Sequence, residues 1–237
     1  MKHWLGRGAI FAGLISLLSG CATTGTADPR DPLEGFNRGV YSVNKTLDTA
    51  IFDPVGKVYK FITPEIVDEG ITNIFSNLGD VAVVANDILQ FKINQAFMDV
   101  SRIIFNSTAG IGGFFDVATP IALPKHHEDF GQTLATWGIG PGPYLVVPLF
   151  GPSTIRDSIG FAADSFLNPV MYVNDTMTRA GLLTMNYIDF KSDLHATRNL
   201  VEDASIDEYE FVKNAYFEKR QSLINDGEQK TDYSTDF

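Results

Sequence analysis

The 237-residue sequence is poor in several residue types on which particular classes of protein depend. It contains one cysteine, Cys21, so no internal disulfide framework can form. Its four histidines leave few candidates for the general base of a hydrolase. The 18 basic residues are outnumbered by 29 acidic ones, which argues against nucleic acid and against attachment to anionic lipid heads.

Long apolar runs are also missing. After Cys21, no uncharged apolar run approaches the roughly 20 residues that a transmembrane helix needs. Before it, Lys2 and Arg7 precede an apolar run over residues 9–18, so residues 1–20 are predicted to be a secretory signal peptide.

The signal ends in Leu-Ser-Gly-Cys, which resembles the lipobox of bacterial lipoprotein precursors. The resemblance implies cleavage before Cys21, a diacylglycerol on its thiol and an acyl chain on its amine. Because two or three acyl chains anchor a protein stably, residues 21–30 would be an acylated tether. Ala22, in place of Asp, implies the periplasmic face of the outer membrane of a Gram-negative bacterium. The alternative is an ordinary signal peptide with an incidental cysteine.

Residues 31–226 show the apolar spacing of helices, and few convincing strands are found, so the expected class is all-α. Each helix should have about 10 to 18 residues, or about 15 to 27 Å. Residues 227–237 are polar and are expected to form a disordered tail. The expected helices are 31–52 (ended by Asp53-Pro54), 63–78, 81–89 (restarted by Gly79-Asp80), 94–104, 153–166 (capped by Ser153), 170–188 and a charged last helix from Ser205.

The segment 110–152 is unusual because it holds eight of the 21 glycines and six of the 11 prolines, yet is apolar and aromatic. A long exposed segment of this kind needs protein or lipid to cover it. Its prolines predict a stiff, extended path from Gly140 to Ser153. Amphipathic helices with an acyl anchor suit a body lying within one membrane leaflet. Composition leaves a second possibility open, a soluble helical domain on a lipid tether.

Several blocks of the sequence resemble the MlaA (VacJ-like) family of phospholipid-binding outer-membrane lipoproteins. The most particular is Trp-Gly-Ile-Gly-Pro-Gly-Pro-Tyr at 137–144, and the others lie at 31–38, 102–118, 128–157 and 207–220. The resemblance implies a helical ring in the inner leaflet of the outer membrane, associated with trimeric porins. It further implies an amphipathic passage for mislocalised phospholipid, which a soluble periplasmic carrier, MlaC, takes onward to the inner membrane.

In that light, neutral side chains among apolar residues are candidates for a lipid passage, because buried charge is costly. The candidates are Asn44, Asn106 and Ser107, although capping or surface positions are the simpler reading of any single asparagine. The glycines permit close backbone approach, so a re-entrant turn at the edge of the passage is expected, with a tight core turn as the alternative. This candidate segment comprises Gly110, Gly112, Gly113, Phe114 and Phe115.

The acidic start of the last helix is a candidate docking site for the periplasmic carrier. Its residues are Asp207, Glu208 and Glu210, for which a solvated helix face is the plainer interpretation. Adjacent residues seldom converge on one ion, so His126-His127-Glu128-Asp129 predicts a solvated turn and no metal site. No cofactor is expected.

Two alternative functions remain. One is a structural or porin-associated envelope lipoprotein that moves no lipid. The other is a lipid hydrolase, which is disfavoured because no Gly-x-Ser-x-Gly motif occurs and Ser153 fits a helix cap better. The sequence thus favours retrograde phospholipid transport without a catalytic step.

Overall fold

The computed structural model describes residues 28–227. The predicted signal peptide, Cys21 and the tail after residue 227 lie outside this range. The elements in chain order are α2 (Glu34–Leu47), η2 (Asp48–Phe52), α3 (Asp53–Ile62), α4 (Glu65–Leu89), α5 (Ile93–Thr108), η3 (Thr119–Ile121), α6 (Phe130–Thr136), β1 (Tyr144–Val147), β2 (Gly151–Thr154), α7 (Ile155–Ser165), η4 (Pro169–Tyr172), α8 (Thr176–Ala204) and α9 (Glu208–Ile224).

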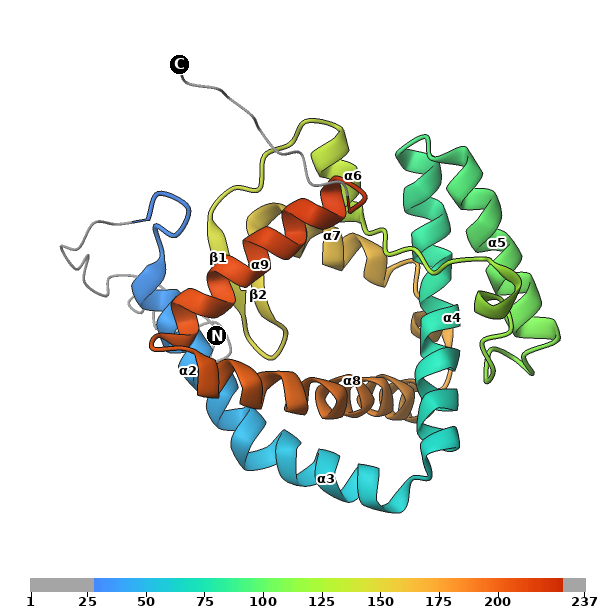
Figure 1. The fold of residues 1–237 in the computed structure, drawn as a ribbon, viewed down its shortest axis with the longest axis horizontal. Helices are drawn as coiled ribbons and strands as arrows, with labels where there is room; N and C mark the ends of the chain where they lie inside the picture. The colour runs from blue at the N-terminus through green and yellow to red at the C-terminus, as the bar shows by residue number, and fades with distance from the viewer. Residues whose placement is uncertain (1–27, 228–237) are drawn as a thin grey trace, which may run out of the picture.

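These elements form a ring around a central opening (Figure 1). Helices α2 and α3 form one side, α4 forms the next, and α6, α7 and the β1–β2 hairpin complete the circuit. Helix α8 lies inside α3, whereas α5 packs on the outer side of α4. Figure 1 is viewed down the shortest axis of the molecule, and the opening is seen face-on. The ring is therefore smallest in the direction that passes through its opening. The predicted all-α class and the ring of helices are confirmed.

The prediction that Asp53-Pro54 ends the first helix is wrong. The π-helical turn η2 joins α2 to α3, and Pro54 lies in the first turn of α3. The amide of Asp53 donates to the carbonyl of Asp48, five residues earlier. This spacing is that of a π-helix, whereas an α-helix bonds residues four apart. Because proline is tolerated where a helix begins, the helical path continues through this site.

The predicted restart at Gly79-Asp80 is also wrong, since α4 runs unbroken for 25 residues. The Asp80 carboxylate is buried and pairs with Lys125, so it does not cap a helix. A single glycine inside a helix costs only about 1 kcal/mol, which a long helix tolerates. With its 29 residues, α8 likewise exceeds the expected length.

The stiff path expected from Gly140 to Ser153 contains an antiparallel hairpin that the sequence analysis did not find. Tyr144 lies opposite Thr154, and Val147 lies opposite Gly151. A two-stranded sheet has only edge strands, which is where Pro152 can be accommodated. Leu149 and Gly151 turn the chain at the tip with φ values of 70° and 90°.

One small apolar cluster holds this hairpin to α2 and α9. Tyr144, Val146 and Tyr209 are buried there, with Val40 and Tyr41 packed against them. This cluster holds the hairpin in the ring wall, and the tip projects toward the opening (Figure 1).

The later helices begin near the predicted positions with different caps. Thr154, in place of Ser153, caps α7 by accepting a 3.2 Å hydrogen bond from the amide of Asp157. Asp207, in place of Ser205, caps α9 by accepting from the amide of Glu210 at 3.2 Å. The helix expected at 170–188 begins at Thr176 and continues to Ala204, because the short η4 takes up Pro169–Tyr172.

Candidate functional site

The distribution of polar and apolar residues in the ring is the reverse of that in a water-soluble protein. Among the described residues, seven apolar residues are buried, against 21 polar or charged ones. In the same range, 39 large apolar side chains are exposed. Soluble proteins bury large apolar residues and almost never bury charges fully. Apolar surface on this scale marks contact with a membrane or with other proteins.

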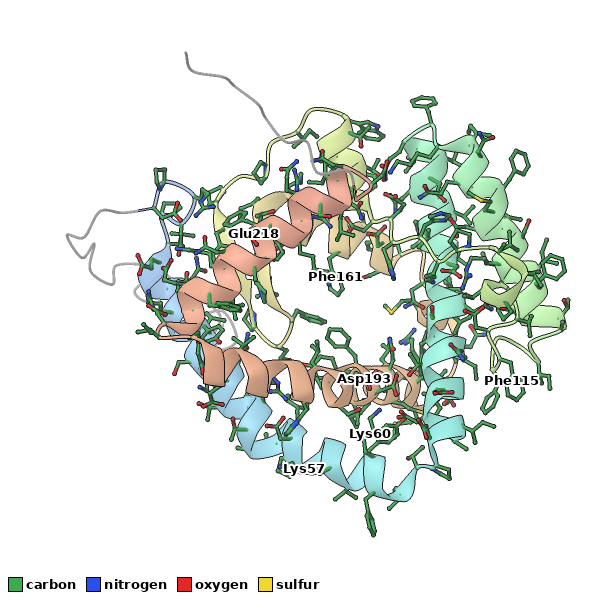
Figure 2. All side chains as sticks on the ribbon, in the orientation of Figure 1. Lys57, Lys60, Phe115, Phe161, Asp193 and Glu218 are labelled. Atoms are coloured by element: carbon green, nitrogen blue, oxygen red, sulfur yellow. The ribbon has the colours of Figure 1, made fainter. Side chains whose placement is uncertain are left out.

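Several strongly exposed apolar side chains lie on the outer elements. Phe61 is 90% exposed at the end of α3, and Phe91 is 84% exposed between α4 and α5. Phe97 on α5 is 68% exposed, and Figure 2 shows Phe115 at the outer edge of the ring. We call this surface, which runs along α3, the ends of α4 and the outer face of α5, the apolar rim.

Polar contacts inside the wall join elements that are distant in sequence. Arg220 of α9 binds Asp129 at 2.5 Å and Asp157 at 2.8 Å, which connects α9 to the starts of α6 and α7. Burial alone would raise the pKa of Asp129, but the Arg220 guanidinium holds that pKa below its usual value. Lys60 of α3 lies 2.7 Å from Asp193 of α8 (Figure 2). The side chains of Arg220 and Asp157 are only 11% and 8% exposed, so this pair stands where a soluble domain would have an apolar core, whereas Lys60 and Asp193 pair at the surface.

Aromatic rings gather where the hairpin tip meets the opening. The ring centroid of Phe150 is 4.8 Å from that of Phe161 and 6.2 Å from that of Tyr187. Phe52 adds a contact of 5.1 Å with Tyr187. Figure 2 places Phe161 on the side of α7 that faces the opening. This aromatic cluster is an apolar surface of the kind that acyl chains contact.

A cavity of about 270 Å³ lies between α2, η2, the hairpin tip, α8 and α9. Asn44, a predicted passage residue, and Glu208, a predicted docking residue, both line it. The amide of Asn44 donates to the carbonyl of Val147 at 3.0 Å, and its oxygen accepts from Leu149 at 2.8 Å. Asn44 therefore fixes the hairpin tip at the edge of the cavity.

Two groups of ion pairs form the polar wall of this cavity. The two oxygens of Asp48 bind Lys191 at 2.9 Å and Arg198 at 3.0 Å, and Arg198 also pairs with Asp53. In the second group, Lys45 of α2 lies 2.8 Å from Glu208 of α9, and the hydrogen bond to that carboxylate raises the pKa of Lys45. The first group holds η2 to α8, and the second holds α2 to α9.

The remaining predicted passage residues are grouped together, but on the outer side of α4. Asn106 accepts hydrogen bonds from the amides of Val117 and Ala118 at 2.9 and 3.0 Å. Ser107 accepts from Asn77 of α4 at 3.0 Å. The Asn106 contacts hold the chain that follows α5 to the end of that helix, and the Ser107 contact attaches the same end to α4.

The glycine and phenylalanine segment makes a tight turn at the same place. A β-carbon on Gly110 would lie 2.2 Å from the carbonyl oxygen of Phe115, so only glycine fits there. Gly112 and Gly113 have φ values of 69° and 90°. The ring of Phe114 packs directly on α4, where a β-carbon at Gly70 would lie 2.2 Å from it. The arrangement favours the tight turn over a surface that lines the central opening, and any role in lipid passage stays a prediction.

The predicted docking acids are all engaged in ion pairs within the protein. Asp207 binds Arg38 at 2.9 Å, and Glu210 binds Lys213 at 2.9 Å. The pairs of Asp207 with Arg38 and of Glu208 with Lys45 attach the start of α9 to α2, whereas the pair of Glu210 with Lys213 lies within α9. Docking of a carrier at this surface remains a prediction.

The predicted solvated turn at 126–129 is wrong for three of its four side chains, which the wall holds, whereas His127 is exposed. Nδ1 of His126 lies 2.8 Å from Asp99 of α5, and partial burial lowers the pKa of His127. Glu128 is buried and accepts from Gln90 at 2.8 Å. Among the described side chains, no group of three or more His, Cys, Asp or Glu is placed to hold a metal ion.

The sequence did not predict that Asp48, Lys191 and Arg198 line the cavity. One signal was available, since Lys191 and Arg198 are seven residues apart, roughly two helical turns, and so share a face of α8. Their partner, Asp48, lies 143 residues before Lys191, and no local pattern connects them.

In the part of the chain that the structure describes, no helix combines the length and the apolarity needed to cross a membrane. The 25-residue α4 runs along the circumference of the ring (Figure 1).

Comparison with known proteins identifies relatives over most of the chain. The family model described as MlaA lipoprotein matches residues 29–223. A protein of Escherichia coli named intermembrane phospholipid transport system lipoprotein MlaA is 36% identical over 222 residues, covering 91% of this chain and 87% of the relative. The protein of the same name from Haemophilus influenzae is 26% identical over 227 residues, covering 90% of each chain.

A solved structure extends the likeness to the fold. It is described as the structural basis for maintenance of bacterial outer membrane lipid asymmetry. It matches this chain with a TM-score of 0.73 and 32% identity, covering 82% of this chain and 99% of the other. By family match, by sequence identity and by fold, the chain belongs to the MlaA lipoprotein family.

Proposed function

We propose that this protein takes mislocalised phospholipid from the outer leaflet of the outer membrane and passes it to a periplasmic carrier of the MlaC type. The observation that carries the proposal is the reversed distribution of residues, apolar on the exterior and polar within a wall that surrounds an opening. The Escherichia coli relative, named as a lipoprotein of intermembrane phospholipid transport, supports the same function. The product of this activity is a maintained lipid asymmetry of the outer membrane.

The proposed location is the periplasmic leaflet of the outer membrane. Half of the hydrocarbon layer is about 15 Å thick, which suits a ring flattened along its axis better than an upright bundle. The apolar rim would then contact acyl chains or the apolar outer surface of a trimeric porin. Cys21 would carry the diacylglycerol and N-acyl chains that attach the ring to this leaflet.

The proposed transport has no chemical step. A passage that does no work cannot shift an equilibrium, so the carrier's affinity for lipid would set the direction of transport. The carrier would receive lipid near Asp207, Glu208 and Glu210. Release of lysophospholipid or free fatty acid from vesicles by the pure protein would contradict this view and indicate a lipid hydrolase.

The direct test is deletion of the gene, followed by labelling of phospholipid exposed at the cell surface. Surface phospholipid should increase in the deletion strain and return to its original level when the full-length gene is supplied. An unchanged amount of surface phospholipid would contradict transport and favour a structural lipoprotein associated with porin.

A further inference from the structure

We propose that the cavity between α2, η2, α8 and α9 binds the head group of a zwitterionic phospholipid that carries an ammonium, such as phosphatidylethanolamine. Lys191 and Arg198 would hold its phosphate, and Glu208 and the ring of Tyr41 would hold its ammonium. This inference rests on the proposed function, because it names the class of lipid that the protein handles.

The phosphate end of the cavity is defined by two cations that share one carboxylate. Asp48 bridges Lys191 and Arg198 through its two oxygens, at 2.9 and 3.0 Å. A phosphodiester resembles that carboxylate, since two oxygens share one negative charge. Nε of Arg198 is buried and has no hydrogen-bond partner among the described side chains, which leaves one donor of the guanidinium available to a ligand. A phosphate beside Asp48 would accept charge-assisted hydrogen bonds from this pair of cations.

The ammonium end has more negative than positive charge. Lys45 is shared by two carboxylates, those of Glu208 at 2.8 Å and Glu202 at 3.3 Å. The hydroxyl of Tyr41 donates to Glu208 at 3.4 Å, which places its ring beside the same carboxylate. A second ammonium would complement the unmatched negative charge, and the face of an aromatic ring attracts such a cation.

Size and total charge favour a zwitterionic head over an anionic one. The volume of about 270 Å³ is slightly below the roughly 300 Å³ at which pockets for whole drug-sized ligands begin, so the cavity suits a head group without its chains. Phe150 lines the cavity and also contacts Phe161 at the opening, which gives the acyl chains an apolar route out of the cavity.

Three basic and four acidic side chains line the cavity, so its formal charge is −1 and an anionic head group would be repelled. They are Lys45, Lys191, Arg198, Asp48, Asp53, Glu202 and Glu208.

The test measures which phospholipid the acylated, full-length protein retains. The purified protein in mild detergent is equilibrated with equal amounts of phosphatidylethanolamine and phosphatidylglycerol, re-isolated, and its bound lipid is quantified by mass spectrometry. The wild type should retain at least about threefold more phosphatidylethanolamine, a preference of about 0.7 kcal/mol. Equal retention of the two lipids, or a preference for phosphatidylglycerol, would overturn the proposal.

Two variants place the preference in this cavity. Glu208→Gln removes a carboxylate of the ammonium end and takes the formal charge of the cavity from −1 to 0, so it should reduce the ratio to about one. Val201→Phe fills the cavity without changing its charge and should do the same. Glu218→Gln is the matched control, because it removes an exposed carboxylate of α9 that does not line the cavity. It should keep the ratio of the wild type.

The same variants separate this inference from the proposed function. If Glu208→Gln and Val201→Phe both retain the wild-type ratio, the cavity is not the head-group site, whatever the surface-phospholipid assay shows. If the deletion strain shows no change in surface phospholipid, the transport function fails independently of where lipid binds.

Discussion

Asn37 illustrates how a single polar side chain replaces apolar packing in this wall. It is fully buried and donates to Asp31 at 2.8 Å and to the carbonyl of Tyr144 at 3.1 Å. Its oxygen accepts from the amide of Val146 at 2.9 Å. Strand β1 pairs with β2 along one edge. Along its other edge, Asn37 provides the partners for the carbonyl of Tyr144 and the amide of Val146.

Replacement of Asn37 by alanine should lower the free energy of unfolding by at least about 2 kcal/mol, because each buried backbone group left without a partner costs about 1–3 kcal/mol. Chemical denaturation in detergent measures the change. Asn214→Ala, at an exposed position of α9, is the control and should change stability by less than about 0.5 kcal/mol. Equal effects at the two positions would contradict the role given to Asn37.

Asp87 gives a prediction about pH. Its side chain is fully buried, and burial, followed by the neighbouring carboxylates of Asp99 and Glu128, raises its pKa to about 8. An aspartate in an unfolded chain has a pKa of about 3.9. Between those values the folded protein binds more protons at this site than the unfolded chain does. The contribution of Asp87 to stability is therefore present at low pH and decreases as the pH rises from about 4 to about 8.

An Asp87→Asn variant should lose this contribution, so its free energy of unfolding should fall less steeply between pH 5 and pH 8 than that of the wild type. Its amide oxygen can still accept the 2.8 Å hydrogen bond from Gln95. Denaturation curves at several pH values measure the slope, with the exposed Glu69→Gln as the control. Identical slopes for the wild type and Asp87→Asn would show that Asp87 is ionised at neutral pH.

At the scale of the elements, the crossing of α6 and α7 depends on two facing glycines. A β-carbon on Gly160 of α7 would lie 2.3 Å from the backbone nitrogen of Gly131 in α6. Such a contact requires a backbone to move, because no flexible side chain is present to give way. Gly79 in α4 differs, since nothing lies within 4 Å of the β-carbon it would carry.

Two alanine variants test this difference between helices. Gly160→Ala should destabilise the protein by about 1–3 kcal/mol, since it overpacks the α6–α7 crossing. Gly79→Ala should instead stabilise it by about 0.5–1 kcal/mol, because it removes backbone freedom from an uncrowded helix interior. If both variants shift the unfolding midpoint in the same direction, the close crossing does not limit the packing of these helices.

Apolar periodicity located most helices but not where they join. The start of α4 after Pro64, the position of α5 and the start of α9 within a few residues of Ser205 were all predictable from local patterns. The continuity across Pro54 and Gly79 was not, because it depends on a π-turn and on the pairing of Asp80 with Lys125, 45 residues away. The hairpin was missed because two four-residue strands among prolines show little alternation.

For the whole molecule, the family resemblance predicted the ring, whereas composition left a soluble tethered domain open. The candidate site was predicted less well. Asn44 and Glu208 do line a cavity, but Asn106, Ser107 and the Gly110–Phe115 turn lie between α5 and α4. An asparagine among apolar residues predicts burial among polar partners, and only the tertiary arrangement decides whether those partners face the ring's opening or its rim.

The reversed distribution of residues is what separates a membrane-embedded ring from a soluble domain. A soluble protein buries most of its large apolar side chains, whereas 39 of them are exposed among the described residues. Removal of the acyl anchor should therefore leave a protein that still requires an amphiphile.

The most direct measurement uses the mature chain with Cys21→Ser, purified in detergent and freed of it in the presence or absence of phospholipid vesicles. With vesicles, the protein should float with the lipid; without them, it should aggregate, as light scattering would show. A compact, monodisperse monomer that is stable in buffer without bound lipid or detergent would contradict the account that the ring lies within a leaflet.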